Sequence, residues 1–117
     1  MQLVCYSRCT TCKKAQQWLD SQGIAYTWRD IKQDNPSRQE LTEWQLTSGL
    51  PLRRFFNTSG QLYREMQLKD KLATMSQAEQ FDLLASDGLL VKRPLLVASD
   101  FVLVGFKQAE WEQRLAR

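Results

Sequence analysis

Two cysteines separated by two residues stand near the start of the sequence, at Cys9 and Cys12. They follow the short apolar run 3–6 and precede a helical pattern. A helix N-terminus carries a partial positive charge and unpaired N–H groups, and both favour a thiolate over a thiol. The placement predicts a redox pair or a thiolate nucleophile, with Cys12 about one turn beyond Cys9 and within disulfide reach.

A structural metal site is a second interpretation of the same two cysteines. One C-x-x-C supplies two thiolates, whereas a structural zinc ion usually needs four ligands. The sequence holds no histidine and one further cysteine, Cys5, which lies in the apolar run and is expected to be a small core residue. We therefore expect neither a metal nor a bound cofactor.

The composition indicates one ordinary globular domain spanning residues 1–117. Hydrophobic residues make up 43% and charged residues 25% of the chain. No apolar run approaches the roughly 20 residues that span a bilayer, and the N-terminus lacks the features of a signal peptide. The net charge of +3 is mild, with basic and acidic residues interspersed. We expect a cytoplasmic protein with no membrane partner and no direct nucleic-acid partner.

The elements around the two cysteines form a strand–helix–strand pattern. Residues 2–6 and 24–31 are predicted as strands, and residues 10–22 as an amphipathic helix that ends at Gly23. The apolar face of that helix is expected to be formed by Cys12, Ala15, Leu19 and Gln22. Two strands joined in this way usually run parallel in one sheet.

The middle of the chain, about 37–88, is predicted to be a helical insertion. Ser37 with Glu40, and Ser76 with Glu79, have the spacing of capping boxes that begin helices. The buried stripe of the first helix is expected to be formed by Leu41, Trp44 and Leu46. Shorter helical pieces are expected at 50–56, with Pro51 in its first turn, and at 62–68.

The last third returns to strands. Residues 95–97 and 101–104 are predicted as a hairpin, followed by a helix at 107–115. The order β-α-β, helical insertion, β-β-α is that of an α/β, thioredoxin-like fold with a four-stranded mixed sheet and helices on both faces. Pro94 immediately precedes the third strand. Folds of this kind carry a cis-proline there, facing the active cysteine.

Several of these motifs together resemble those of a known family. The stretch Tyr-Ser-Arg-Cys-Thr-Thr-Cys-Lys-Lys-Ala at 6–15 and the pair Arg93–Pro94 are similar to the opening and closing motifs of the arsenate reductase (ArsC) and Spx family. The resemblance covers essentially the whole chain. The segments 54–60, 68–72 and 104–106 are most similar to the uncharacterised, arsenate reductase-like branch of that family.

The resemblance implies roles for individual residues. Cys9 matches the nucleophilic cysteine, and Arg93 matches one of three arginines that hold the arsenate oxyanion. Asn57 and Gly105 stand at about the positions of the other two, and neither supplies the bidentate, charge-assisted bonds of an arginine. The resemblance therefore implies weak arsenate reduction, unless other cations substitute. The candidates for substitution are Arg53, Arg54 and Lys92.

Three functions remain open at this point. The first is a thiol-based oxidoreductase in which Cys9 is the nucleophile, Cys12 the resolving thiol, and Arg93 stabilises an anion or the thiolate. Glutathione, glutaredoxin or thioredoxin would be its electron donor, with glutathione as a co-substrate. The second is an Spx-like regulator that binds RNA polymerase and uses the cysteine pair as a redox switch; the third is a true arsenate reductase. Candidate anion- or substrate-binding residues are Arg8, Lys13, Asn57 and Pro94.

Overall fold

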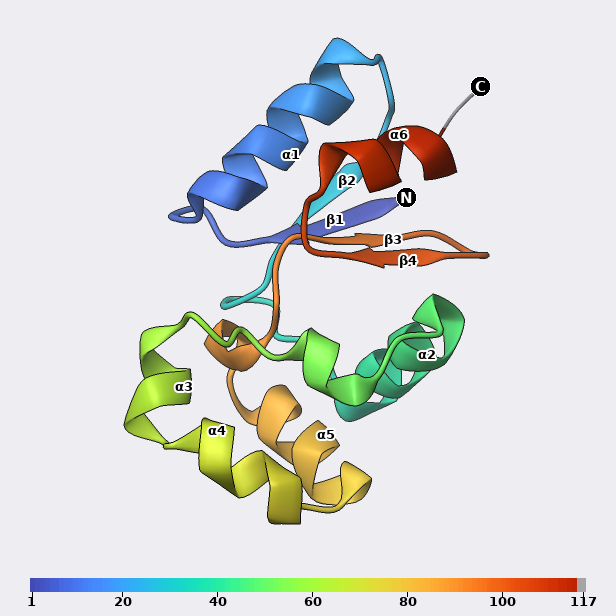
Figure 1. The fold of residues 1–117 in the computed structure, drawn as a ribbon. Helices are drawn as coiled ribbons and strands as arrows, with labels where there is room; N and C mark the ends of the chain where they lie inside the picture. The colour runs from blue at the N-terminus through green and yellow to red at the C-terminus, as the bar shows by residue number, and fades with distance from the viewer. Residues whose placement is uncertain (116–117) are drawn as a thin grey trace.

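The computed structural model describes residues 1–115 and places a mixed sheet between two groups of helices (Figure 1). Its strands are β1 (Gln2–Cys5), β2 (Thr27–Asp30), β3 (Leu95–Val97) and β4 (Val102–Val104), in the order β2-β1-β3-β4. β1 pairs parallel with β2 and antiparallel with β3, which pairs antiparallel with β4. The predicted α/β fold with a four-stranded mixed sheet is confirmed.

The second strand is shorter than predicted. Helix α1 (Thr10–Ser21) ends with Gly23 at a φ of 66°, and the N–H of Ile24 donates to the carbonyl of Leu19 at 3.1 Å. This closure turns the chain back onto the helix, so pairing with β1 begins only at Thr27. Ile24 lies outside the strand, and its side chain packs into the core.

One face of the sheet is covered by α1 and α6 (Gln108–Arg114) (Figure 1). On α1 the buried residues are Cys12, Ala15 and Leu19, and on α6 the buried residue is Trp111. These side chains form one core cluster with Leu3, Cys5 and Leu96 of the sheet. The prediction that Gln22 belongs to the buried face is wrong, because Gln22 is the exposed C-cap residue, beyond the last helical turn.

The other face of the sheet packs against the helical insertion (Figure 1). Its α-helices are α2 (Arg38–Ser48), α3 (Gln61–Glu65), α4 (Leu68–Lys71) and α5 (Gln77–Ser86). Both predicted capping boxes are present, at the starts of α2 and α5. Short 3₁₀ turns at Leu52–Phe55 and Leu72–Thr74 connect these helices, and a third at Gly88–Leu90 leads from α5 towards β3.

Three details of the helical insertion differ from the prediction. Leu46 is 72% exposed, because two residues of helix rotate it about 200° away from the buried Trp44. The predicted helix 62–68 is two helices, separated by Gln67 at a φ of 55°. The predicted helix 50–56 is a 3₁₀ turn with Pro51 at its N-cap, not in its first turn.

Candidate active site

Cys9 is the N-cap residue of α1, as the sequence predicts. Its backbone N–H donates to the carbonyl of Tyr6 at 3.0 Å, so a tight turn leads from β1 into the helix. The Cys9 side chain makes no capping hydrogen bond and is half-buried. Its thiol therefore lies at the positive end of α1 and remains accessible to a substrate.

Cys12 lies behind Cys9 and is fully buried. The neighbouring thiol of Cys5, above all, lowers the pKa of Cys12 to about 7 against the opposing effect of burial. The neighbouring thiol of Cys12, together with burial, raises the pKa of Cys5. All three cysteines are free thiols: Cys5 and Cys12 belong to one buried cluster, and Cys9 packs against it.

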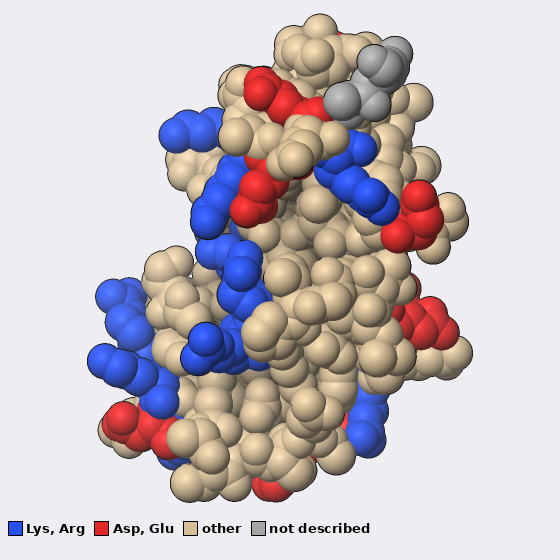
Figure 2. Space-filling view, turned by 45° about the vertical axis from the view of Figure 1, so that its right-hand side comes forward, with Lys and Arg blue, Asp and Glu red and all other residues tan. Residues whose placement is uncertain are grey.

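An open cavity of about 570 Å³ lies in front of Cys9. Positive side chains dominate its lining, which contains no Asp or Glu among the described residues. Figure 2 shows Lys and Arg side chains gathered along one edge of the molecule. The cationic lining residues are Arg8, Arg54, Lys92, Arg93 and Lys107. The positive charge of this cavity attracts anions towards the Cys9 thiol.

Arg93 lies between this cavity and a second cavity of about 500 Å³. Its Nη1 donates to the carbonyl of Leu89 at 3.1 Å, and its guanidinium lies over the Tyr6 ring, 5.3 Å from the ring centre. Both contacts fix the side chain beside the thiols, where its charge contributes to lowering the pKa of Cys12. The Arg93–Pro94 peptide bond is cis.

The residues predicted for the site are only partly brought together. Arg8 and Asn57 line the cavity with Cys9 and Arg93. Lys13 is exposed on α1 and does not belong to the lining. Pro94 is buried outside the lining, and its carbonyl accepts a hydrogen bond from the N–H of Gly105.

The structure also identifies which cations accompany Arg93. Of the three named as substitutes from the sequence, Arg54 and Lys92 line the cavity, whereas Arg53 lines a different one. Lys92 lies close to Gly105: a Cβ at Gly105 would be 3.3 Å from the Lys92 Cε.

Lys107 was missed by the sequence analysis. It is the N-cap of α6, two residues after Gly105, and the predicted start of that helix was the available signal.

Two further observations concern metal ions and membrane-spanning helices. Within residues 1–115, no group of three His, Cys, Asp or Glu side chains is arranged to hold a metal ion. No helix in the same part of the chain is long and apolar enough to cross a membrane.

Known proteins are similar to this chain over nearly its whole length. Residues 5–114 match the model of the ArsC family. The uncharacterized protein YusI of Bacillus subtilis is 48% identical over 111 residues, covering 95% of this chain and 94% of YusI. The global transcriptional regulator Spx 1 of Bacillus cereus is 23% identical over 109 residues, covering 93% of this chain and 82% of the regulator.

Solved structures agree with this relationship. An ArsC family related protein from Bacteroides fragilis is 53% identical, with a TM-score of 0.94 over 96% of this chain and 94% of that one. A "possible arsenate reductase" from Streptococcus mutans is 42% identical, with a TM-score of 0.88 over 97% of both chains. The fold and the arrangement of elements described above are shared with both.

Proposed function

Because the chain belongs to the ArsC family, we propose that it is a cytoplasmic thiol-based oxidoreductase that reduces anionic disulfides. One observation carries the proposal. The accessible thiol of Cys9 opens into a cavity lined by five cationic residues, and Cys9 packs against the buried cluster that contains Cys12, about one helical turn further along α1. A nucleophilic thiol, a resolving thiol and an anion-binding surface are the three parts that such a reaction requires.

The reaction would proceed by two thiol–disulfide exchanges. The Cys9 thiolate attacks one sulfur of the substrate disulfide, so a Cys9–substrate disulfide forms and the other half leaves as a thiolate. Cys12 then attacks the Cys9 Sγ, and its proton passes to the departing substrate thiolate. The substrate gains two electrons, and the protein holds a Cys9–Cys12 disulfide.

An external thiol must complete the cycle. Glutathione, glutaredoxin or thioredoxin would attack the Cys9–Cys12 disulfide and restore both thiols while being oxidised itself. Neither a metal nor a bound cofactor takes part in these steps. Glutathione carries carboxylates, so as a co-substrate it would also be attracted to the cations around Cys9.

A reductase assay with two rival disulfide substrates tests the proposal. We expect faster turnover of a mixed glutathione disulfide, which is anionic, than of the neutral hydroxyethyl disulfide, and a difference that shrinks as salt is added. Cys9→Ser should abolish both activities. Equal turnover of the anionic and neutral disulfides at low salt would contradict the assignment of the basic cavity as the substrate site.

Two neighbouring arginines provide a matched control. Arg54 lines the Cys9 cavity and Arg53 lines a different one, although both are exposed and lie in the same 3₁₀ turn. Arg54→Ala should raise the KM for the anionic disulfide by about twofold to fivefold, since exposed charge pairs contribute about 1 kcal/mol or less. Arg53→Ala should leave it unchanged.

A redox-switched regulator is the second candidate. Its specific support is the similarity to the transcriptional regulator Spx 1 over 93% of the chain, together with the retained C-x-x-C. In that case the partner would be RNA polymerase, and the Cys9–Cys12 disulfide would control binding. Pull-down with purified polymerase under reducing and oxidising conditions distinguishes the two, since a dedicated oxidoreductase should not retain the polymerase in either state.

A further inference from the structure

Asn57 is a buried polar residue whose side-chain amide is only partly satisfied by the protein. The residue is 8% exposed, and its Oδ1 accepts one long hydrogen bond, from the Ser59 hydroxyl at 3.4 Å. Its Nδ2 donates no hydrogen bond to any residue of 1–115, yet no side-chain nitrogen or oxygen in this range is both enclosed and unpartnered. The Nδ2 group therefore reaches a cavity, where a ligand can accept a hydrogen bond from it.

The backbone fixes Asn57 in this place. Its N–H donates to the carbonyl of Leu90 at 2.8 Å, and its carbonyl accepts from the N–H of Gly60 at 3.1 Å. A Cβ at Gly60 would lie 2.5 Å from the Asn57 Nδ2. The absence of a side chain at Gly60 thus leaves the space that the amide occupies.

Asn57 lies where two cavities meet. One is the cationic cavity in front of Cys9, and the other is the second cavity of about 500 Å³; Asn57, Gly60 and Arg93 line both of them. Cations and acids are balanced in the second cavity, whose charged lining residues are Lys32, Glu65, Asp87 and Arg93. A ligand that lies across both cavities would have an anionic part near Cys9 and a part of little net charge beyond Asn57.

The chemistry of a primary amide selects the ligand. Nδ2 is a donor and Oδ1 keeps a free lone pair, so Asn57 offers a donor and an acceptor side by side. A peptide group offers the complementary pair, a carbonyl that accepts and an N–H that donates. An inorganic oxyanion or a simple carboxylate has acceptors only, and a guanidinium binds it better. The ligand group that satisfies both atoms of the Asn57 amide is therefore a peptide group.

We propose that Asn57 is a substrate-binding residue that pairs with a peptide group, so the substrates are disulfides of cysteine-containing peptides. The inference rests on the proposed oxidoreductase function and narrows its substrate class. The substrate disulfide lies at Cys9, a carboxylate of the peptide lies among the cations of that cavity, and the peptide chain passes Asn57 into the second cavity. No bond is made or broken at Asn57, which acts through binding alone.

Two disulfides of equal charge test the proposal. The disulfide of N-acetylcysteinylglycine carries one carboxylate and peptide groups in each half, whereas dithiodiglycolate carries one carboxylate in each half and no peptide group. Asn57→Ala should lower the preference for the peptide disulfide, measured as the ratio of the two kcat/KM values, by about threefold to tenfold through KM, which corresponds to one or two neutral hydrogen bonds. The loss should persist in high salt, because salt does not screen a neutral hydrogen bond.

Two further variants guard against a simple folding defect. Gly60→Ala keeps Asn57 but displaces its amide, so it should lower the same preference. Thr58→Ala is the control, because Thr58 is exposed in the same turn and belongs to the lining of neither cavity; it should leave the preference unchanged. An unchanged preference in Asn57→Ala or in Gly60→Ala, or the same loss in Thr58→Ala, would overturn the proposal.

A binding measurement does not depend on turnover. S-methyl-N-acetylcysteinylglycine contains the peptide but no reactive sulfur, and calorimetry or NMR titration gives its Kd. Asn57→Ala should weaken binding by the same factor of about threefold to tenfold, and equal Kd values would contradict the role of Asn57. If the wild-type protein reduced neither disulfide, the proposed function would fail, whereas this titration would still decide whether Asn57 binds a peptide group.

Discussion

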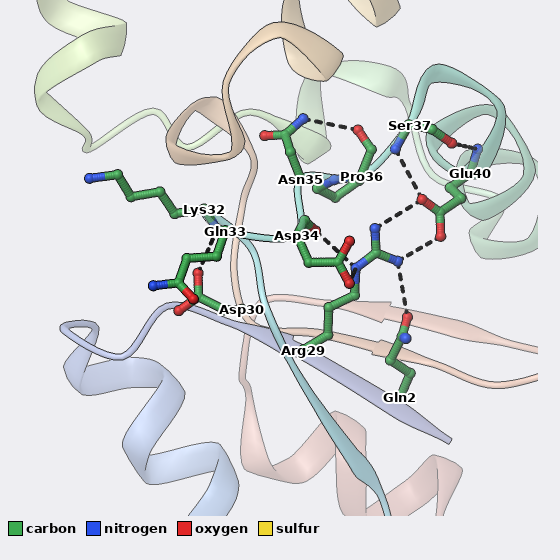
Figure 3. A network of polar contacts seen from close by, with 10 residues as sticks. All are labelled: Gln2, Arg29, Asp30, Lys32, Gln33, Asp34, Asn35, Pro36, Ser37 and Glu40. Carbon is green, nitrogen blue, oxygen red and sulfur yellow. Dashed lines mark hydrogen bonds and ion pairs between the residues drawn. The ribbon is translucent and has the colours of Figure 1, made fainter.

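The guanidinium of Arg29 and the carboxylate of Glu40 form a two-pronged ion pair, with Nη1 2.6 Å from Oε2 and Nη2 2.9 Å from Oε1 (Figure 3). Arg29 lies on the edge strand β2 and is 8% exposed, whereas Glu40 lies in the first turn of α2. The pair therefore joins the sheet to the helical insertion, which carries part of the cavity wall.

This ion pair predicts a loss of stability in acid. Arg29, with help from the N–H of Ser37, lowers the pKa of Glu40 from 4.5 to about 2. A lowered carboxylate pKa stabilises the folded state above its ordinary value, and that stabilisation is lost as the pH falls from about 4.5 towards 2. Glu40→Gln should destabilise the protein by about 1–2 kcal/mol at neutral pH. The loss is expected to be modest because the Glu40 carboxylate is partly exposed and water screens its charge. Urea denaturation should show that difference shrinking through the acidic range.

Glu79→Gln is the matched control for Glu40→Gln. Glu79 closes the same type of capping box with Ser76 at the start of α5, and no ion pair to Glu79 is present within residues 1–115. Its replacement should therefore destabilise the protein less than Glu40→Gln. Equal losses would show that Glu40 acts through its helix cap rather than through Arg29.

A second prediction concerns the disulfide itself. Mild oxidation with diamide should link Cys9 to Cys12 and leave Cys5 reduced, because Cys9 is the accessible thiol and Cys12 lies about one helical turn beyond it in α1. Peptide mapping by mass spectrometry identifies the linkage. Cys9→Ser should abolish disulfide reductase activity, and Cys12→Ser should lower it in part, since an external thiol can still release the substrate from Cys9. A dominant linkage through Cys5 would argue against this pairing.

Gly105 provides a third prediction, about the cavity wall. Its φ of 74° lies in the left-handed region, and an added Cβ would approach the Lys92 Cε at 3.3 Å. Gly105→Ala should destabilise the protein by about 1–2 kcal/mol and displace Lys92 from its place beside the cavity.

Gly49→Ala is its control, because Gly49 has a φ of 69° with nothing within 4 Å of an added Cβ. Thermal denaturation should show a similar loss of stability in both variants, because both place a side chain at a positive φ. A higher KM for an anionic disulfide is expected for Gly105→Ala alone.

Local signals in the sequence were sufficient to predict the elements that hold the thiols. Capping boxes and the strand–C-x-x-C–helix order each depend on neighbouring residues, and the structure places both as predicted. The burial of Arg29 was not predicted, because its partners Glu40 and Asp34 come together only when α2 packs on the edge of the sheet. The exposure of Leu46 has a local cause, because a helical residue two positions after the buried Trp44 points to the opposite side of α2.

The cavity shows the same distinction between local and non-local signals. Cys9 and Arg93 were identified as parts of one site through the resemblance, and they line one cavity. Lys107 lines the same cavity from the start of α6. The Trp111 indole N–H donates to the Gly105 carbonyl at 3.0 Å, and this hydrogen bond holds the start of α6 beside the cavity. The shared burial of Cys5 and Cys12 in one cluster likewise depends on the tertiary packing of β1 against α1.

The last prediction is that arsenate is reduced poorly. Asn57 and Gly105 stand where the resemblance places two oxyanion-holding arginines, and both line the cavity. Lys92 beside Gly105 restores a positive charge but not the planar, bidentate geometry of a guanidinium. Losing two charge-assisted contacts of about 1.5–3 kcal/mol each would slow turnover by roughly 10²-fold or more. Steady-state assays with glutathione and glutaredoxin, run beside an arsenate reductase that has all three arginines, provide the measurement. Turnover within about tenfold of that enzyme would mean that Arg54 and Lys92 together replace the missing arginines.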